Sequence, residues 1–176
     1  MGHSASGKKP DPRYRPDRPW AGVVVIVFRG DEFLLTLRAK PPRAGIWGLP
    51  GGALHLGETG FAAAIREVRE ETGILCAPYA SFTTVDVIEP GHPDHDQTDA
   101  RTASDGQVNR HDKTISTTPD YHFLLAAIAA EWKDGTITPA SDATDAGWFD
   151  LGTLNNVPHF PLTKELVLQA LLPRKL

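Results

Sequence analysis

The sequence predicts an α/β fold, an α/β/α sandwich built on a mixed β-sheet. Strand-like apolar segments alternate along the chain with two helical segments, which is the element pattern of an α/β sandwich. The first of these segments, AGVVVIVF at residues 21–28, is a continuous run rich in β-branched residues. Such a run is typical of a strand that is buried on both faces, as strands in sandwiches are.

The other elements follow in order. Residues 33–38 (FLLTLR) form a second strand, and the turn RGDE before it favours a hairpin with the first. Residues 40–45 are a loop. A helix covers residues 59–72, followed by Gly73, which suits the left-handed position that ends a helix. The remaining expected elements are strands at 78–88 and 146–149, a long apolar run at 121–132 whose length alone does not separate strand from helix, and a closing helix at 162–172 stopped by Pro173.

The helix at 59–72 separates apolar from acidic side chains. One set, with the three-to-four spacing of a buried stripe, is Phe61, Ile65, Val68 and Thr72. Glu67, Glu70 and Glu71 fall at i, i+3 and i+4, roughly opposite that stripe and beside the small residues Gly60, Ala63 and Ala64. Like charges at this spacing cost about 0.2–0.5 kcal/mol per pair on an exposed helix. A hard divalent cation turns that repulsion into coordination, whereas the alternative is a solvated acidic face paired with Arg66 and Arg69.

The segment from Gly52 to Ile74, GALHLGETGFAAAIREVREETGI, has the spacing G-x5-E-x7-R-E-U-x-E-E-x-G-U, where U is a bulky apolar residue. This is the pattern of the Nudix box, and on it and on the lead-in WGLPGG at residues 47–52 the chain resembles the Nudix hydrolase family. The resemblance implies a Nudix-type sandwich over residues 19–176 and a strand at 121–132. It also implies an enzyme that uses water to break a pyrophosphate bond in a nucleoside diphosphate linked to another group.

The resemblance further implies roles for individual residues. Mg2+ or Mn2+ would be the cofactor, held by Glu67, Glu70, Glu71 and a backbone carbonyl of Gly51 or Gly52. Arg66 would hold the carboxylates in place, and Glu58 would pair with Arg66 or reach a second metal through water. The catalytic residues are expected to be Arg66, Glu67 and Glu71. The general base stays open between Glu67, Glu71 and the loop acids Glu89, Asp94 and Asp96.

The expected substrate is ADP-ribose or a related nucleotide sugar. The segments KPPRAGIWGLPGG and SDATDAGWFDL, and Pro90 after the box, are similar to ADP-ribose pyrophosphatase-like members of the family. A mutator-type hydrolase of oxidised nucleoside triphosphates is an open alternative. A non-catalytic nucleotide sensor is less favoured, because none of the acidic box residues is lost. Arg38 and Trp47 are candidate substrate-binding residues, although a core role is at least as plausible for Trp47 and Trp148.

Composition limits the remaining possibilities. The 176 residues fit one domain behind a leader at 1–18, which is rich in Pro, Gly and charge and is expected to be mostly disordered. The net charge of -4 argues against a nucleic-acid polymer as partner. Cys76 is the single cysteine, expected to be a buried, inert thiol. With no secretory signal and no apolar run near about 18 residues, we expect a cytoplasmic protein that does not engage membranes, with a homodimer left open.

Residues 89–120 form an unusually long polar segment. It contains several potential ligands: His92, Asp94, His95, Asp96 and His111. Loops of this length are usually functional lids or disordered segments. These residues could bind a metal or position a substrate, although a mobile polar loop is the favoured interpretation.

Overall fold

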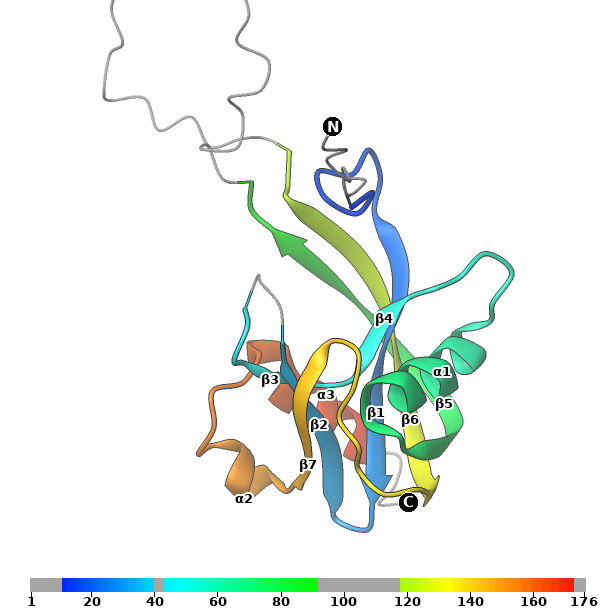
Figure 1. Ribbon diagram of the computed structural model, residues 1–176, viewed down its shortest axis with the longest axis vertical. Helices are drawn as coiled ribbons and strands as arrows, with labels where there is room; N and C mark the ends of the chain where they lie inside the picture. Colours follow the sequence, from blue (N-terminus) through cyan, green and yellow to red (C-terminus); the bar gives the residue numbers. More distant parts are fainter. Residues whose placement is uncertain (1–10, 40–42, 92–117, 173–176) are drawn as a thin grey trace, which may run out of the picture. The chain divides into compact units, whose positions relative to one another are not determined.

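The computed structural model describes residues 11–39, 43–91 and 118–172. The elements, drawn in Figure 1, are β1 (Trp20–Arg29), β2 (Glu32–Arg38), β3 (Trp47–Gly48), β4 (Gly51–Ala53), α1 (Gly60–Thr72), β5 (Leu75–Glu89), β6 (Tyr121–Asp134), β7 (Ala143–Phe149), α2 (Leu151–Leu154) and α3 (Pro161–Leu171). Residue contacts divide the chain into two units. One unit comprises residues 21–85 and 124–176, and the other comprises residues 1–20 and 86–123.

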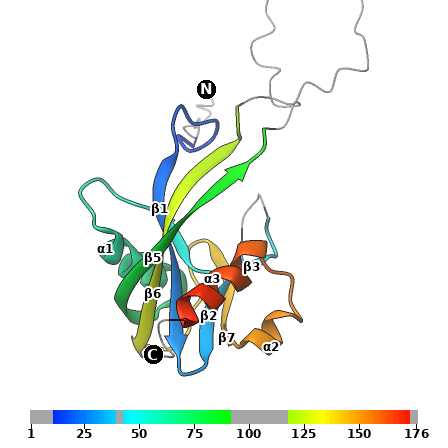
Figure 2. The same cartoon turned by 180° about the vertical axis from the view of Figure 1, so that it is seen from behind.

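The strands form one mixed sheet in the order β3-β2-β1-β6-β5, with β4 pairing with β1 and β7 pairing with β2. The expected hairpin is confirmed, because β1 and β2 pair antiparallel with Phe28 opposite Phe33. The arrowheads of β1 and β6 lie at the same end of the sheet in Figures 1 and 2, so these neighbours run in the same direction. The segment at 121–132 is thus a strand, as the resemblance implied.

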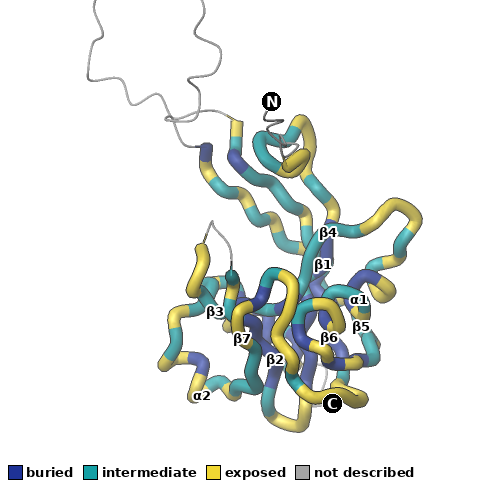
Figure 3. The backbone as a smooth tube through the Cα atoms, viewed as in Figure 1, coloured by how far each residue is buried: buried dark blue, intermediate teal, exposed yellow. Residues whose placement is uncertain are grey.

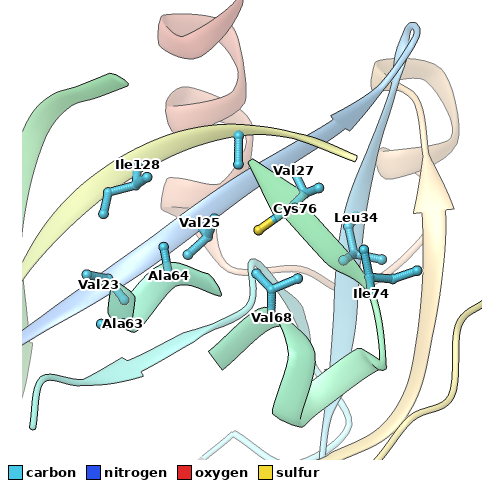
Figure 4. Close-up of a cluster of buried hydrophobic side chains, with 11 residues drawn as sticks. Val23, Val25, Val27, Leu34, Ala63, Ala64, Val68, Ile74, Cys76 and Ile128 are labelled. Atoms are coloured by element: carbon cyan, nitrogen blue, oxygen red, sulfur yellow. The ribbon is translucent and has the colours of Figure 1, made fainter. Parts of the chain in front are cut away.

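Helices cover both faces of this sheet, with α1 on one side and α3 on the other (Figures 1 and 2). The side chains of β1 alternate between two apolar cores. Val23, Val25 and Val27 pack with residues of α1 (Figure 4), whereas Ile26 and Phe28 pack with residues of α3. This double burial explains why residues 21–28 are apolar throughout. Figure 3 shows the buried residues gathered along β1 and β2.

The predicted buried stripe of α1 is partly wrong. Val68 and Thr72 are fully buried, but Phe61 and Ile65 are 41% and 39% exposed. Ala63 and Ala64 are buried in their place and belong to the core shared with β1. Small residues let the helix lie close to the sheet, so the alanines face the core and the larger side chains lie at the margin. The helix boundaries agree with the sequence, since Thr59 caps the N-terminus and Gly73 ends it with φ 73°.

Several elements were not predicted from the sequence. The strands β3 and β4 are short and contain three glycines, which disfavour strands in isolation. They form because their backbones pair with longer strands, with Gly48 opposite Thr36 of β2 and Gly52 opposite Val23 of β1. The short helix α2 begins at a capping box in which Asp150 and Thr153 exchange hydrogen bonds.

Part of the segment expected to be a disordered leader makes specific contacts. The Arg15 amide donates to the Asp120 carbonyl at 2.8 Å, and the Tyr14 and Tyr121 rings meet edge to face with centroids 5.7 Å apart. Asp120, from the long polar segment, is only 6% exposed.

Residues 1–10 and Pro173 lie outside the described residues, as do the loop candidates His92, Asp94, His95, Asp96 and His111. Within the described chain, the helices are too short or too polar to span a membrane.

Candidate active site

The site is organised around Arg66, which projects from α1 toward the loop that precedes this helix. Its Nε donates to Glu58 Oε1 and its Nη2 donates to Glu58 Oε2, both at 2.8 Å. The same Nη2 donates to the Ala53 carbonyl at 3.1 Å. The His55 amide donates to Glu58 Oε2 at 3.0 Å. Hydrogen bonds from Arg66 and His55 hold the pKa of Glu58 at about 2, well below its usual range.

Arg66 also reaches two of the box glutamates. Its Nη1 lies 2.7 Å from Glu67 Oε1 and 3.3 Å from Glu70 Oε2. The hydrogen bonds to Glu58 and, after them, the contact with Glu67 raise the pKa of Arg66 above its already high value, whereas burial acts in the opposite direction. The guanidinium therefore fixes the positions of several carboxylates, as the resemblance led us to expect for Arg66. It pairs with Glu58, which was one of the two roles expected for that residue.

Gly51 and Gly52 bring the backbone of β4 directly against the glutamates of α1. A Cβ atom at Gly52 would overlap the Glu67 carboxylate, and one at Gly51 would overlap the Val23 carbonyl. The Gly51 amide forms a backbone hydrogen bond with the Glu71 carboxyl. Gly52 is therefore needed so that the backbone can approach the Glu67 carboxylate, and Gly51 is needed so that β4 can lie close to β1.

Glu71 differs from the other two glutamates because its carboxyl is deeply buried. Burial, followed by the charge of Glu67, raises the pKa of Glu71 to about 8, whereas the Gly51 amide acts in the opposite direction. Two charges near the strand ends contribute less: Asp142 raises this pKa and Arg38 lowers it. Glu71 Oε2 is buried and lacks a hydrogen-bond partner among the described residues. A buried oxygen of this kind, beside a second carboxylate, fits a hard divalent cation.

The three glutamates of α1 differ in how far they are exposed to solvent. Glu71 Oε2 is buried, the Glu67 side chain is 14% exposed and the Glu70 side chain is 53% exposed. The cluster therefore runs from the interior to the surface along one side of α1. Within residues 11–39, 43–91 and 118–172, no three Asp, Glu, His or Cys side chains converge as a complete metal shell, and Glu67 is instead bonded to Arg66.

An open hollow of about 620 Å³ lies beside the exposed end of this cluster. It is lined by Ala62, Ile65, Arg66, Arg69 and Glu70. The hollow gives a ligand access to Arg66 and Glu70 from solvent.

The two candidate substrate-binding residues lie in different environments. Arg38 ends β2, is exposed, and is close enough for its charge to act on Glu71. Trp47 is half-buried, and its ring lies 4.8 Å from that of Phe149 in the core on the α3 side. The structure thus brings Arg38 to the glutamate cluster and gives Trp47 a packing role. The Arg29 guanidinium lies 4.4 Å from the centroid of the Trp148 ring. Trp148 packs against the core on the α1 side of the sheet.

Several residues at the site carried no signal in the sequence. Asp142 reaches the surroundings of Glu71 only because β7 pairs with β2, with Ala143 opposite Arg38. The carbonyl of Ala53 and the amide of His55 act through their backbones, so their side-chain identities reveal nothing of that role.

The chain is similar in sequence and in fold to several known proteins. A family model described as NUDIX domain matches residues 18–170. The ADP-ribose pyrophosphatase of Methanocaldococcus jannaschii is 31% identical over 157 residues, which cover 86% of this chain and 72% of that protein. The 8-oxo-dGDP phosphatase NUDT18 of Mus musculus is 47% identical over 58 residues, covering 32% of this chain and 18% of that protein. The solved NUDIX domain of Shewanella oneidensis NrtR, complexed with ADP ribose, has a TM-score of 0.61 at 20% identity, with 92% of each chain covered.

Proposed function

This chain belongs to the Nudix family of pyrophosphohydrolases, and from that premise we propose that it hydrolyses ADP-ribose or a related nucleotide sugar with Mg2+ or Mn2+ as cofactor. The observation that carries the proposal is the similarity to an archaeal ADP-ribose pyrophosphatase over 86% of the chain. That similarity extends well beyond the glutamate helix.

The residues that would hold the metal are Glu67, Glu70, Glu71 and a backbone carbonyl of Gly51 or Gly52. The buried Oε2 of Glu71 supports this assignment, because a cation would provide the partner that this oxygen lacks among the described residues. A bound divalent ion supplies charge neutralisation of the diphosphate and a water of lowered pKa. Arg66 keeps Glu58 and Glu67 in place while the substrate binds.

The general base is one of two box residues in this proposal. Glu67 lies against Gly52 and is partly accessible, whereas Glu71 is buried and has its pKa raised to about 8. That pKa belongs to the metal-free protein, and a bound divalent cation would lower it and keep the carboxylate ionised. The loop acids Asp94 and Asp96 lie outside the described residues, and Glu89 ends β5.

The test is a nucleotide panel assayed with Mg2+, Mn2+ and EDTA, using wild type, Glu70→Gln and Glu71→Gln. The expected result is metal-dependent release of AMP and ribose 5-phosphate from ADP-ribose, reduced at least about 100-fold in both variants. Glu165→Gln is the matched control, because Glu165 is an exposed glutamate of α3 bonded only to Gln169 among the described contacts. Equal activity in wild type and Glu71→Gln would contradict the assignment of Glu71.

A mutator-type activity is the second candidate, supported by the 47% identity to an 8-oxo-dGDP phosphatase over 58 residues. The same panel separates the two, because oxidised dGTP or dGDP would then be turned over more efficiently than ADP-ribose. Tight nucleotide binding with no turnover of any compound would instead indicate a sensor, the third possibility that the sequence left open.

A further inference from the structure

The connection between β6 and β7 lies against the end of α1 that carries Glu71 (Figure 1). The last carbonyls of a helix have no partner within the helix, so they need donors from elsewhere. The Ala140 amide donates to the Glu71 carbonyl at 3.0 Å, and the Thr138 amide donates to the Thr72 carbonyl at 2.8 Å. Two backbone donors of this connection therefore complete the last turn of α1.

The same connection is also fixed to the sheet. Ile137 packs against the core on the α1 side of the sheet. The Ala39 amide, directly after β2, donates to the Asp142 carbonyl at 2.8 Å. Ala143 then pairs with Arg38 at the end of β2. The acidic end of α1 is thus tied to β2 by backbone hydrogen bonds, along a path separate from the guanidinium network of the same helix.

Between these two attachments the chain reverses at Ser141, in an uncommon backbone conformation. The Ala143 amide donates to the Ala140 carbonyl at 3.1 Å, so residues 140–143 form a turn. Ser141, its second residue, has φ 59°, whereas the φ of Asp142 is not positive. This is the pattern of a type II′ turn, which normally has glycine at its second position. Backbone strain at a residue other than glycine persists where the surrounding structure, or a function, requires the geometry.

The turn sets the direction of the two groups that flank it. On one side the Ala140 amide faces the Glu71 carbonyl, and on the other side the Asp142 carbonyl faces the Ala39 amide. A negative φ at Ser141 would redirect the chain between these groups, so the two hydrogen bonds could not both be kept. The last turn of α1 would then lose a fixed partner, and helix ends without such partners fray.

We propose that Ser141 is a positioning residue for the metal site, because its left-handed turn holds the last turn of α1, and with it the Glu71 carboxyl, in a fixed place against β4. The inference rests on the proposed function, since it concerns the cation that the same glutamates would hold. The Gly51 amide of β4 reaches the Glu71 carboxyl, and the turn supports Glu71 from its backbone side. Binding groups must be held within about 0.5 Å of their working positions, which a fraying helix end does not achieve.

The test separates the backbone conformation at residue 141 from the identity of its side chain. Ser141→Val disfavours φ 59°, because a β-branched residue rarely adopts a positive φ. Ser141→Gly and Ser141→Asn keep that conformation accessible, so they are the rescuing variants. Ser81→Val is the matched control, because it makes the same change at an exposed position of β5, where valine suits a strand.

Two measurements are made on the full chain without nucleotide. Calorimetric titration with MnCl2 gives the affinity for the metal alone, and amide exchange followed by NMR reports the bonds of Thr138 and Ala140. Ser141→Val is expected to weaken Mn2+ binding about tenfold and to lose protection of both amides, whereas the Gly and Asn variants stay within about twofold of wild type. The control should match wild type in both measurements.

A second variant acts on the same connection from its other end. Gly135 has φ 98°, and a Cβ atom there would lie 2.8 Å from the carbonyl oxygen of Gly73, the residue that ends α1. Gly135→Ala therefore pushes the connection away from the helix end and leaves the turn at Ser141 unchanged. It is expected to weaken Mn2+ binding in the same direction, and it decides the question by the same criteria if Ser141→Val does not fold.

Several results would overturn the proposal. They are an unchanged Mn2+ affinity in Ser141→Val, equal losses in the Val and Gly variants, and no Mn2+ binding by wild type. Loss of amide protection without loss of Mn2+ affinity also overturns it, because the turn is then structural only. Mn2+ binding that depends on residue 141 in a protein that hydrolyses no nucleotide supports the inference and refutes the proposed activity. Metal-dependent hydrolysis of ADP-ribose, with Mn2+ affinity indifferent to residue 141, does the reverse.

Discussion

Arg66 and Glu58 form a two-point ion pair, with Nε to Oε1 and Nη2 to Oε2 both at 2.8 Å. The pair joins the loop before α1 to the middle of that helix. Because the third nitrogen, Nη1, bonds Glu67 at 2.7 Å, the same guanidinium connects loop closure to the position of a candidate metal ligand. A parallel fork of this kind is geometrically specific, and lysine cannot reproduce it.

Replacing Arg66 by leucine is expected to lower the free energy of unfolding by about 1–3 kcal/mol, because Glu58 and Glu67 lose charged partners while largely shielded from water. Urea denaturation measures this change. Arg69→Leu on the same helix is the control, with an expected change within about 0.5 kcal/mol, because Arg69 is exposed. Equal effects of the two substitutions would show that the network contributes no specific stability. Arg66→Lys is expected to recover only part of the loss.

The Glu58 pair also predicts a dependence of stability on pH. The pKa of Glu58 is lowered from 4.5 to about 2, because the ionised carboxylate is more stable in the folded protein than in the unfolded chain. This stabilisation is fully present above about pH 4.5 and is lost as the pH falls through about 2. Glu58→Gln should therefore melt below wild type at pH 7, with the gap closing toward pH 2. Thermal melts at several pH values would reject the pair if the gap were constant.

In the metal-free protein, the raised pKa of Glu71 should give the opposite dependence of folding stability on pH. Its pKa is raised from 4.5 to about 8, so folding favours the neutral carboxyl and stability falls as the pH rises from about 4.5 through about 8. Glu71→Gln removes this dependence and is expected to be more stable than wild type at pH 9 in EDTA. Added Mg2+ should stabilise wild type more than the variant. Parallel stability curves for the two proteins in EDTA would contradict the burial of an ionisable group here.

Gly52→Ala tests the close approach of β4 to α1. The added methyl group would overlap the Glu67 carboxylate, so Glu67 would have to move away from Arg66 and Gly52. We expect kcat for the preferred nucleotide to fall at least about tenfold, with a smaller loss of stability. Gly60→Ala is the matched control, because a Cβ atom there would make only an ordinary contact, 3.5 Å from Ile128 Cδ1. Full activity of Gly52→Ala would show that the position of Glu67 tolerates displacement.

Cys76 is expected to be unreactive in the folded protein. It is 7% exposed, and burial raises the pKa of its thiol to about 11, so little thiolate forms near neutral pH. A chromogenic disulfide reagent should react with it slowly under native conditions and rapidly in guanidinium chloride. Rapid labelling of the native protein would indicate that β5 opens away from the core.

The outline of the fold could be predicted because it rests on local patterns. The apolar run at 21–28, the hairpin with β2, and the capped helix ending at Gly73 all depend on the sequence near each element. The buried face of α1 could not be predicted in the same way. A stripe that includes Phe61 and Ile65 and one that includes Ala63 and Ala64 are both compatible with a helix that has one buried side. Close packing against β1 places the two alanines in the core.

The sequence by itself determined the family and the reaction class, because the box specifies residue types at spacings that one helix brings together. Tertiary structure decided how those residues differ. Glu71 Oε2 is buried while the Glu70 side chain is 53% exposed, and Trp47 packs against the core on the α3 side. Burial, and the pKa values that follow from it, depend on strands distant in the sequence. No pattern within a single segment contains that information.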